Sequence, residues 1–284
     1  MPGVNRAKGS GEANNTTTYC ERLFAALISE DAGRILINKE KLEIEFRDGR
    51  SGLKPKVIEG YLRSVLASLN LKLKNPVQNP DDSGGDVRAI FRKQPIWFEL
   101  KMQTKKPKFA DLTQADYVRE GTDFVRKVLQ THPEAMSALS DWTKEAIQAT
   151  KRLEKGWDLW ALLLADLCLL KDAQHRHKVG VKTPQDLLDF AKRKYLVLLT
   201  QEGTRWIKIS DLALFAEVAK SKKVNLAFNM SNKTDLSIQI RGEHRRVDFT
   251  YHIGYTSTEV SGRHKLHAGA VARSEGLVEI RSAT

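Results

Sequence analysis

Two short apolar segments separated by a polar connection constrain the fold of this chain more than any other feature. The segments are Val87–Phe91 and Ile96–Met102, and Arg92-Lys-Gln-Pro95 lies between them. The preceding stretch, from Asn75 to Gly85, is dense in Asn, Pro, Asp, Ser and Gly, which are turn formers. Short apolar runs bounded by turn signals are typical of strands, so the sequence predicts a β-hairpin over 87–102.

Helical patterns flank this hairpin. Apolar residues recur at helical spacing over Tyr19–Ser29 and over Pro55–Asn70. A helix-rich stretch is predicted around 113–194, and strands return at Tyr195–Thr200. From Val224 to the end the apolar period is mostly two, which predicts a β-rich C-terminal region. These patterns together indicate an α/β (α+β) chain.

The same patterns divide the chain into three parts. Residues 1–18 are predicted to be a disordered polar tail. Residues 19–210 form a core that contains the helical insertion around 113–194, and residues 211–284 form the β-rich region, either as a separate domain or as part of the core. With about 150 residues per domain, a length of 284 residues is compatible with two domains.

The chain is strongly basic, with 47 Lys and Arg against 35 Asp and Glu, a net charge of +12. A summed positive field concentrates polyanions, so nucleic acid is the favoured partner and an anionic membrane surface the alternative. Hydrophobic residues make up 41% and charged residues 29%. This composition excludes a fibrous repeat, a wholly disordered chain and a polytopic membrane protein.

Cysteine usage and the apolar segments predict a cytoplasmic protein without a membrane span. Cys20 and Cys168 are the only cysteines, which indicates neither a disulfide framework nor a zinc site. The first residues have no apolar run of the secretory type. The most apolar stretch, 157–170, is too short to cross a bilayer and carries Asp158 and Asp166, so it is predicted to be a buried helix.

Three charged residues on the predicted hairpin are the candidate catalytic residues. Side chains alternate along a strand, so Glu99 and Lys101 share one face while Phe98 and Leu100 turn into the core. If Asp86 begins the partner strand, its carboxylate comes beside that of Glu99. Two carboxylates with open positions can hold Mg²⁺, which activates water and neutralises charge on a phosphate. A lysine beside them can orient the water or stabilise the transition state.

Glu99-Leu-Lys101 is the only acidic-x-Lys tripeptide in the chain, so no second candidate competes with it. It falls on a predicted strand that follows a Gly-Gly-Asp turn and a first strand. The alternative interpretation is an edge strand on which Glu99 and Lys101 form a solvated ion pair, because such pairs are common and weak.

Asp86 followed thirteen residues later by Glu99-x-Lys101 resembles the signature of the PD-(D/E)xK nucleases, in particular the type II restriction endonucleases. The resemblance covers about residues 55–110. It implies a mixed β-sheet flanked by helices and Mg²⁺-dependent hydrolysis of DNA. It also implies that Asp86 and Glu99 are metal ligands, that Lys101 is the third catalytic residue, and that the Leu100 carbonyl is an extra ligand. Gly85 stands where the signature has Pro.

Accessory residues follow from the same resemblance. Many family members carry a Glu on the helix before the first catalytic strand, and Glu59 has this place in the predicted helix 55–70. A solvent-facing role for Glu59 is the alternative, and Glu21 is the next candidate for the extra metal ligand. Gln103 continues the strand face of Glu99 and Lys101, where it is able to contact a phosphate.

Residues that bind DNA are expected in two places. Lys105, Lys106 and Lys108 directly follow the catalytic strand, where lysines contact phosphates. In the C-terminal region, arginines pair with guanine edges and amides with adenine. The expected reading residues, centred on a hairpin tip at 241–246, are Asn232, Arg241, His244, Arg245 and Arg246.

The sequence therefore predicts a sequence-specific, Mg²⁺-dependent endonuclease of double-stranded DNA, similar to a type II restriction enzyme. A palindromic target would make a two-fold homodimer the natural assembly. One alternative is a structure-selective repair or recombination nuclease on the same fold. The other is a non-catalytic, basic DNA-binding protein.

Overall fold

The computed structural model describes the chain in segments, and these form two compact units. The described residues are 10–33, 41–43, 46, 52–80, 84–102, 116–118, 123–131, 154–170, 172–201, 203–211, 225–232, 235–241, 246–256, 259–266 and 278–281. The first unit consists of Met1–Pro107, Arg193–Ile207 and Leu277–Thr284, and the second of Lys108–Lys192 and Lys208–Gly276. The helical stretch and the C-terminal strands are thus grouped in the second unit, a different grouping from the expected boundary at 210.

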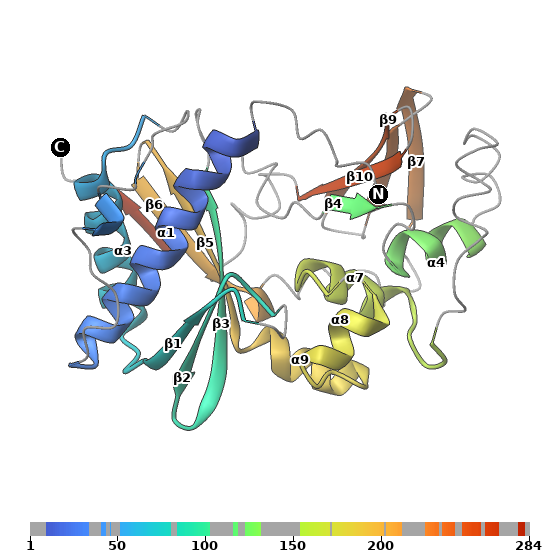
Figure 1. Cartoon of the computed structure of the whole chain (residues 1–284). Coiled ribbons are helices and arrows are strands. Elements are labelled where there is room, and N and C mark those ends of the chain that lie inside the picture. The colour runs from blue at the N-terminus through green and yellow to red at the C-terminus, as the bar shows by residue number, and fades with distance from the viewer. Residues whose placement is uncertain are drawn as a thin grey trace, which may run out of the picture. The chain divides into compact units, whose positions relative to one another are not determined.

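The first unit contains a six-stranded mixed sheet with the order β1-β2-β3-β5-β6-β11. Its strands are β1 (Lys74–Gln78), β2 (Val87–Phe91), β3 (Gln94–Met102), β5 (Lys194–Thr200), β6 (Gly203–Lys208) and β11 (Val278–Arg281). The central pair, β3 and β5, is parallel, whereas β1–β2, β2–β3 and β6–β11 are antiparallel. The expected mixed α/β class, with a sheet packed against helices, is confirmed (Figure 1).

Strands β2 and β3 form the predicted hairpin with a shorter connection than expected. Because β3 begins at Gln94, only Arg92 and Lys93 join the two strands. Both have positive φ, 49° and 68°, as the central residues of a type I′ turn do. This turn matches the twist of the strands, but the left-handed backbone is costly for residues with a Cβ. The turn therefore places two exposed cations at the tip at some cost in stability.

Strand β1 lies in a stretch that the sequence predicts to be only turns. Pro76 has no N–H to donate, which disfavours it in a central strand. However, β1 is the first strand in the sheet order and so lies at an edge. Its pairing with β2 shifts register between Lys74 and Val77, on either side of Pro76. An irregular edge strand tolerates Pro76, so the turn-forming residues of this segment are compatible with strand β1.

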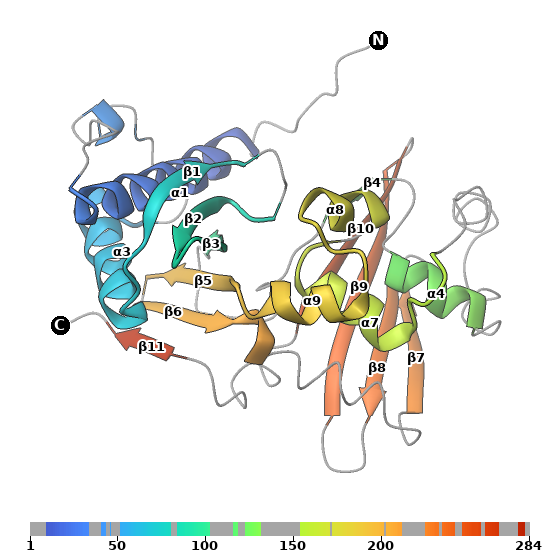
Figure 2. The ribbon, with the colours of Figure 1, turned by 90° about the horizontal axis from the view of Figure 1, so that it is seen from below.

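Two helices, α1 (Ser10–Asp31) and α3 (Pro55–Leu69), pack with the sheet of the first unit (Figures 1 and 2). Helix α3 follows the predicted segment closely, with Pro55 in its first turn and Asn70 as a left-handed C-cap. Helix α1 begins at Ser10, inside the segment 1–18 that was expected to be a disordered tail. That expectation is corrected for residues 10–18, whereas residues 1–9 lie outside the described part of the chain.

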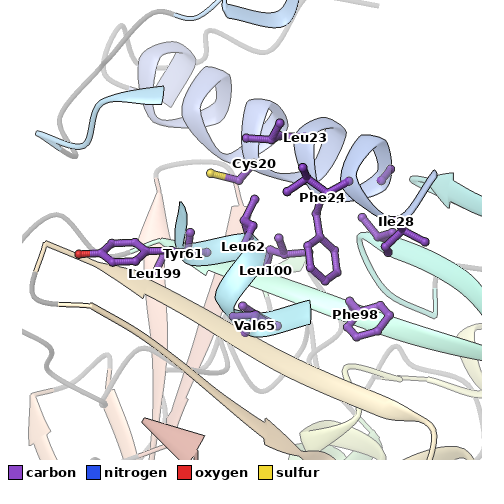
Figure 3. Close-up of a cluster of buried hydrophobic side chains, with 14 of the residues drawn as sticks. Cys20, Leu23, Phe24, Ile28, Tyr61, Leu62, Val65, Phe98, Leu100 and Leu199 are labelled. Carbon is purple, nitrogen blue, oxygen red and sulfur yellow. The ribbon is translucent and has the colours of Figure 1, made fainter. Parts of the chain in front are cut away.

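A buried apolar cluster joins these helices to one face of the sheet (Figure 3). The Phe24 ring from α1 meets the Phe98 ring of β3 edge-on, with centroids 5.0 Å apart. Phe98 in turn stacks on Tyr195 of β5 at 5.5 Å. Phe98 and Leu100 are almost completely buried in this cluster, as the alternation of β3 predicted. The opposite face of β3 is thereby assigned to Trp97, Glu99 and Lys101.

The second unit contains a five-stranded antiparallel sheet with the order β4-β10-β9-β8-β7. Its strands are β4 (Asp116–Val118), β7 (Asn225–Asn232), β8 (Asp235–Arg241), β9 (Arg246–Thr256) and β10 (Glu259–Leu266). Ile238, Phe249 and Leu266 share one row across the sheet, and Ser237, Thr250 and Lys265 share the next. Alternate residues along each strand lie on opposite faces of the sheet. The period-two prediction for this region is confirmed.

Helices of the second unit are held together by a buried arginine. They are α4 (Asp123–Thr131), α7 (Leu159–Leu167), α8 (Ala173–Lys178) and α9 (Pro184–Ala191). The Nη2 of Arg176, on α8, lies 2.8 Å from Asp123 of α4 and 2.7 Å from Glu154. Its guanidinium also lies 4.2 Å from the centre of the Trp157 ring. These contacts compensate a cation that is only 1% exposed.

The apolar stretch 157–170 forms a short buried helix, as predicted. Helix α7 has only nine residues, and the Asp158 carboxylate caps it by accepting from the Ala161 N–H at 3.3 Å. Asp166, the second acid of the stretch, is buried with its neighbours. Among the helices that the structure describes, none combines the length and the apolar character needed to span a membrane.

The strained turn at 92–93 leads to a stability prediction. We expect the double substitution Arg92→Asn with Lys93→Gly to raise the free energy of unfolding by about 1 kcal/mol, because Asn-Gly adopts the type I′ turn without the Cβ penalty. Urea denaturation followed by circular dichroism measures the change. Lys93→Ala is the control, since it keeps a Cβ at φ 68° and should not stabilise. Equal gains from the two variants would show that backbone strain is not the cause.

Candidate active site

The candidate site lies where β2 separates from β3. The ladder between these strands ends at the Val87–Phe98 pair, one residue before Asp86 and Glu99 would meet. Two glycines precede Asp86 and approach β3 closely. A Cβ on Gly85 would lie 2.8 Å from the Phe98 carbonyl oxygen, and a Cβ on Gly84 would overlap the Trp97 indole. Only glycine fits this close approach at position 85.

A backbone hydrogen bond anchors Asp86 to the neighbouring strand. The Leu100 N–H donates to Asp86 Oδ2 at 2.7 Å. Leu100 lies beyond the last β2 partner, so its N–H has no ladder partner on β2 and takes the carboxylate instead. The N–H and C=O of one strand residue point to the same side, which directs the Leu100 carbonyl toward the Asp86 side of β3 as well. The structure thus brings Asp86 next to the Glu99-Leu100-Lys101 segment.

Glu99 is a buried carboxylate that contacts two lysines. It is 6% exposed. Lys101 Nζ donates to Oε1 of Glu99, and Lys194 Nζ lies 3.4 Å from Oε2. Lys194 begins β5 and is 1% exposed. A solvated surface pair, the alternative interpretation of Glu99 and Lys101, does not describe this buried arrangement.

Sequence reasoning missed Lys194. It is separated from Glu99 by 95 positions in the chain, and no motif joins them. The parallel register aligns Trp97 with Lys194 and Glu99 with Leu196, so Lys194 shares the sheet face of Glu99. The one available signal was its place directly before the apolar strand Tyr195–Thr200, where a lysine is often simply exposed.

The two carboxyl groups have pKa values shifted in opposite directions. Burial, followed by repulsion from Glu99, raises the pKa of Asp86 from 3.8 to about 7, against the opposing effects of Lys101 and the Leu100 N–H. Burial also acts to raise the pKa of Glu99, but the charges of Lys101 and Lys194 outweigh it and hold that pKa below its ordinary value. Burial favours neutral Lys101, yet Glu99 and Asp86 together raise its pKa. These directions favour the charged forms of Glu99 and Lys101 and the protonated form of Asp86.

The two accessory acids have different surroundings in the structure. Glu21 on α1 is buried, accepts from Gln78 Nε2 at 3.3 Å, and has a pKa raised by burial and, more weakly, by Glu99. Glu59 on α3 instead pairs with Arg63, four residues later, at 2.7 Å. Which of the two is an accessory metal ligand stays a prediction, and the described contacts favour Glu21. Sequence pattern placed both on helices but could not show which helix end faces Asp86.

The donor set fits a hard cation in its chemistry. Asp86 and Glu99 offer carboxylate oxygens, and the Leu100 carbonyl is the expected third oxygen; Mg²⁺ takes such ligands and keeps waters for its remaining positions. Repulsion from Glu99 contributes to the raised pKa of Asp86, and a cation bound to these carboxylates would oppose that repulsion. Within the described residues, no group of three or more His, Cys, Asp or Glu side chains is arranged to hold a metal ion.

The expected DNA-binding residues are described only in part. Gln103, Lys105, Lys106, Lys108, His244 and Arg245 lie outside the described residues. Arg241 and Arg246 pair across the β8–β9 hairpin, so the predicted hairpin tip at 241–246 is confirmed. Asn232 pairs with Asp235 at the other end of β8, about 20 Å away at the usual rise per strand residue. Asn232 therefore lies at the opposite end of the sheet from the arginine hairpin.

Comparisons with known proteins give no further support for a family. No protein-family model matches the chain, and neither a curated protein nor a solved structure matches it.

The raised pKa of Asp86 predicts how one substitution changes stability with pH. Between pH 4 and pH 7 the folded state keeps a proton that the unfolded state loses, so stability falls as pH rises through the folded pKa. Asp86→Asn removes this loss. In the presence of a chelator we expect the variant to exceed the original chain in free energy of unfolding by on the order of 2 kcal/mol at pH 8, and by little near pH 4.

Urea denaturation at a series of pH values measures this difference. Asp189→Asn, which removes an exposed acid that pairs with Lys192, is the control and should show no such dependence. A difference that grows toward acid pH would contradict the assigned shift.

Proposed function

We propose that this chain is a Mg²⁺-dependent endonuclease that cleaves double-stranded DNA at specific sequences. The observation that carries the proposal is the group at the end of β2: Asp86 anchored on the Leu100 N–H, beside a buried Glu99 that is paired with Lys101. Burial of charged groups disfavours folding, and such groups with strongly shifted pKa values are concentrated at functional sites. The net charge of +12 favours a polyanionic substrate.

Each residue of the site has a role that follows from its position. Asp86 and Glu99 hold the metal ion, with the Leu100 carbonyl as a further oxygen, while the Leu100 N–H fixes the Asp86 carboxylate. A bound Mg²⁺ supplies an activated water and neutralises charge on the phosphate. Lys101 has a raised pKa and stays protonated, so it acts by donating hydrogen bonds to a phosphate oxygen or to the attacking water. A protonated Lys101 cannot accept a proton, so it does not act as the general base.

The rest of the chain supplies contacts to DNA in this proposal. Lys105, Lys106 and Lys108 directly follow β3 in sequence and contact phosphates. The hairpin that ends in Arg241 and Arg246 carries base recognition, since arginines bind guanine edges. A two-fold homodimer would suit a palindromic target. Cys20 and Cys168 are buried and not joined in a disulfide, in keeping with a reducing cytoplasm.

A specific observation keeps the structure-selective nuclease as a second candidate. Asn232 and the arginine hairpin lie at opposite ends of β8, so the expected reading residues do not form one compact surface. A nuclease that recognises DNA shape needs phosphate contacts but no such surface. Digestion of a phage genome with and without Mg²⁺, followed by sequencing of the fragment ends, separates the two. Discrete fragments with a shared end sequence support a site-specific enzyme.

Substitution of the three central residues tests the chemistry. We expect Asp86→Ala, Glu99→Ala and Lys101→Ala each to lower the cleavage rate by at least about a thousandfold, because each removes charge that acts in the transition state. Binding of the same DNA in Ca²⁺, measured by fluorescence anisotropy, should remain within about threefold, since phosphate contacts elsewhere supply the affinity. Full cleavage by the Glu99→Ala and Lys101→Ala chains would refute the assignment.

Glu21 and Glu59 provide a matched pair for the accessory role. Glu21→Gln should slow cleavage about tenfold, because residues that support metal ligands have effects of this size. Glu59→Gln should cleave at the original rate, since Glu59 pairs with Arg63 rather than with the site. Initial rates at saturating Mg²⁺ measure both. Slow cleavage by the Glu59 variant, with an unaffected Glu21 variant, would restore the order that the sequence predicts.

A further inference from the structure

Lys194 is a buried cation in a strand whose next two residues on the same face are apolar. Residues two and four positions further along β5, Leu196 and Leu198, share its face and are buried. Strand β5 has no exposed residue along its length. A lysine at this place loses its hydration, and its ammonium Nζ compensates part of that loss by approaching Glu99 Oε2 at 3.4 Å. An apolar residue of similar volume would fold with less cost.

The two lysines divide the oxygens of Glu99 between them. Lys101 donates to Oε1 from the same strand, and Lys194 approaches Oε2 from the adjacent parallel strand. The two lysines differ in their exposure to solvent. Lys101 is partly exposed and is the residue assigned to the phosphate or the water, whereas Lys194 is enclosed. A metal ion that takes Oε1 as a ligand competes with Lys101 for that oxygen, whereas the contact of Lys194 with Oε2 is left in place.

We propose that Lys194 is a positioning residue for Glu99, an inference that rests on the proposed nuclease function. Lys194 retains Oε2 when a metal ion takes Oε1 from Lys101, so that the Glu99 carboxylate keeps its orientation. It also keeps a positive charge beside Glu99, and the buried carboxylate is therefore never left without a counter-charge. In this arrangement Lys194 contacts neither substrate nor metal and acts only through Glu99.

A role as mere counter-charge makes a different prediction from a positioning role. A cation close to a metal site repels the metal, so removing a simple counter-charge should strengthen Mg²⁺ binding. Removing a positioning residue should weaken it, because Glu99 then loses its fixed orientation; losses of about 10- to 100-fold are usual for residues that orient metal ligands. The sign of the change in Mg²⁺ affinity thus distinguishes the two roles.

The experiment compares Lys194→Met with Lys192→Met in the full chain. Met preserves length and apolar bulk, so it suits a position flanked by buried leucines. Lys192 is exposed and pairs with Asp189, which makes its replacement a matched control. Mg²⁺ alone is titrated, and the shift in the thermal unfolding midpoint reports binding in the absence of DNA. Cleavage rate against Mg²⁺ concentration and DNA binding in Ca²⁺ are measured on the same proteins.

For Lys194→Met we expect the half-saturating Mg²⁺ concentration to rise about tenfold or more in both the unfolding and the cleavage titrations. DNA affinity in Ca²⁺ should stay within about threefold of the original, since phosphate contacts elsewhere supply it. Lys192→Met should match the original chain. Lys194→Arg keeps the charge and should recover part of the lost Mg²⁺ affinity.

Unchanged or tighter Mg²⁺ binding by a folded Lys194→Met chain overturns the inference while the proposed function stands. If Lys194→Met does not fold, Lys194→Arg decides: original Mg²⁺ affinity together with original cleavage supports a charged residue that orients Glu99, and tighter Mg²⁺ binding overturns it. A chain of original sequence that cleaves no DNA with Mg²⁺ overturns the proposed function itself, and the inference with it.

Discussion

The buried carboxylate of Glu99 sets the conditions that its surroundings must meet. An ionised group on an enclosed sheet face is costly unless charges and hydrogen bonds compensate it. Lys101 and Lys194 supply that compensation, one at each oxygen. The pKa of Asp86 rises instead to about 7, because burial and repulsion from Glu99 outweigh the opposing effects of Lys101 and the Leu100 N–H.

The glycine pair before Asp86 shows how backbone geometry makes this arrangement possible. Gly84 packs against the Trp97 indole and Gly85 approaches the Phe98 carbonyl, so the chain just before β2 stays close to β3 beyond the end of the ladder. At that point the Leu100 N–H has no backbone acceptor on β2, and it donates to the Asp86 carboxylate instead. The opposite face of β3 is held rigid by Phe98 and Leu100 in the helix-covered core (Figure 3). Catalytic groups placed on such rigid elements need little reorganisation to react.

Sequence reasoning predicted those features that depend on neighbours in the chain. The hairpin over 87–102, the helix over 55–70 and the division of β3 into a core face and a charged face follow from local periodicity, and the structure confirms them. Features that depend on partners distant in the chain were missed. Turn formers concealed β1, because only its edge position makes Pro76 acceptable. The helical insertion and the C-terminal strands form one unit, which no local pattern indicates.

The amino-acid sequence by itself determined the candidate chemistry of this protein: one acidic-x-Lys tripeptide on a strand, an aspartate after two glycines, and a cationic excess that favours a polyanion. Tertiary structure alone decided which groups complete the site. Lys194 joins Glu99 through the parallel pairing of β3 with β5, and Glu21 rather than Glu59 interacts with the site residues, because helix α1 carries it there. Periodicity specifies the face on which a side chain lies, whereas packing across the sheet specifies which distant charge it meets.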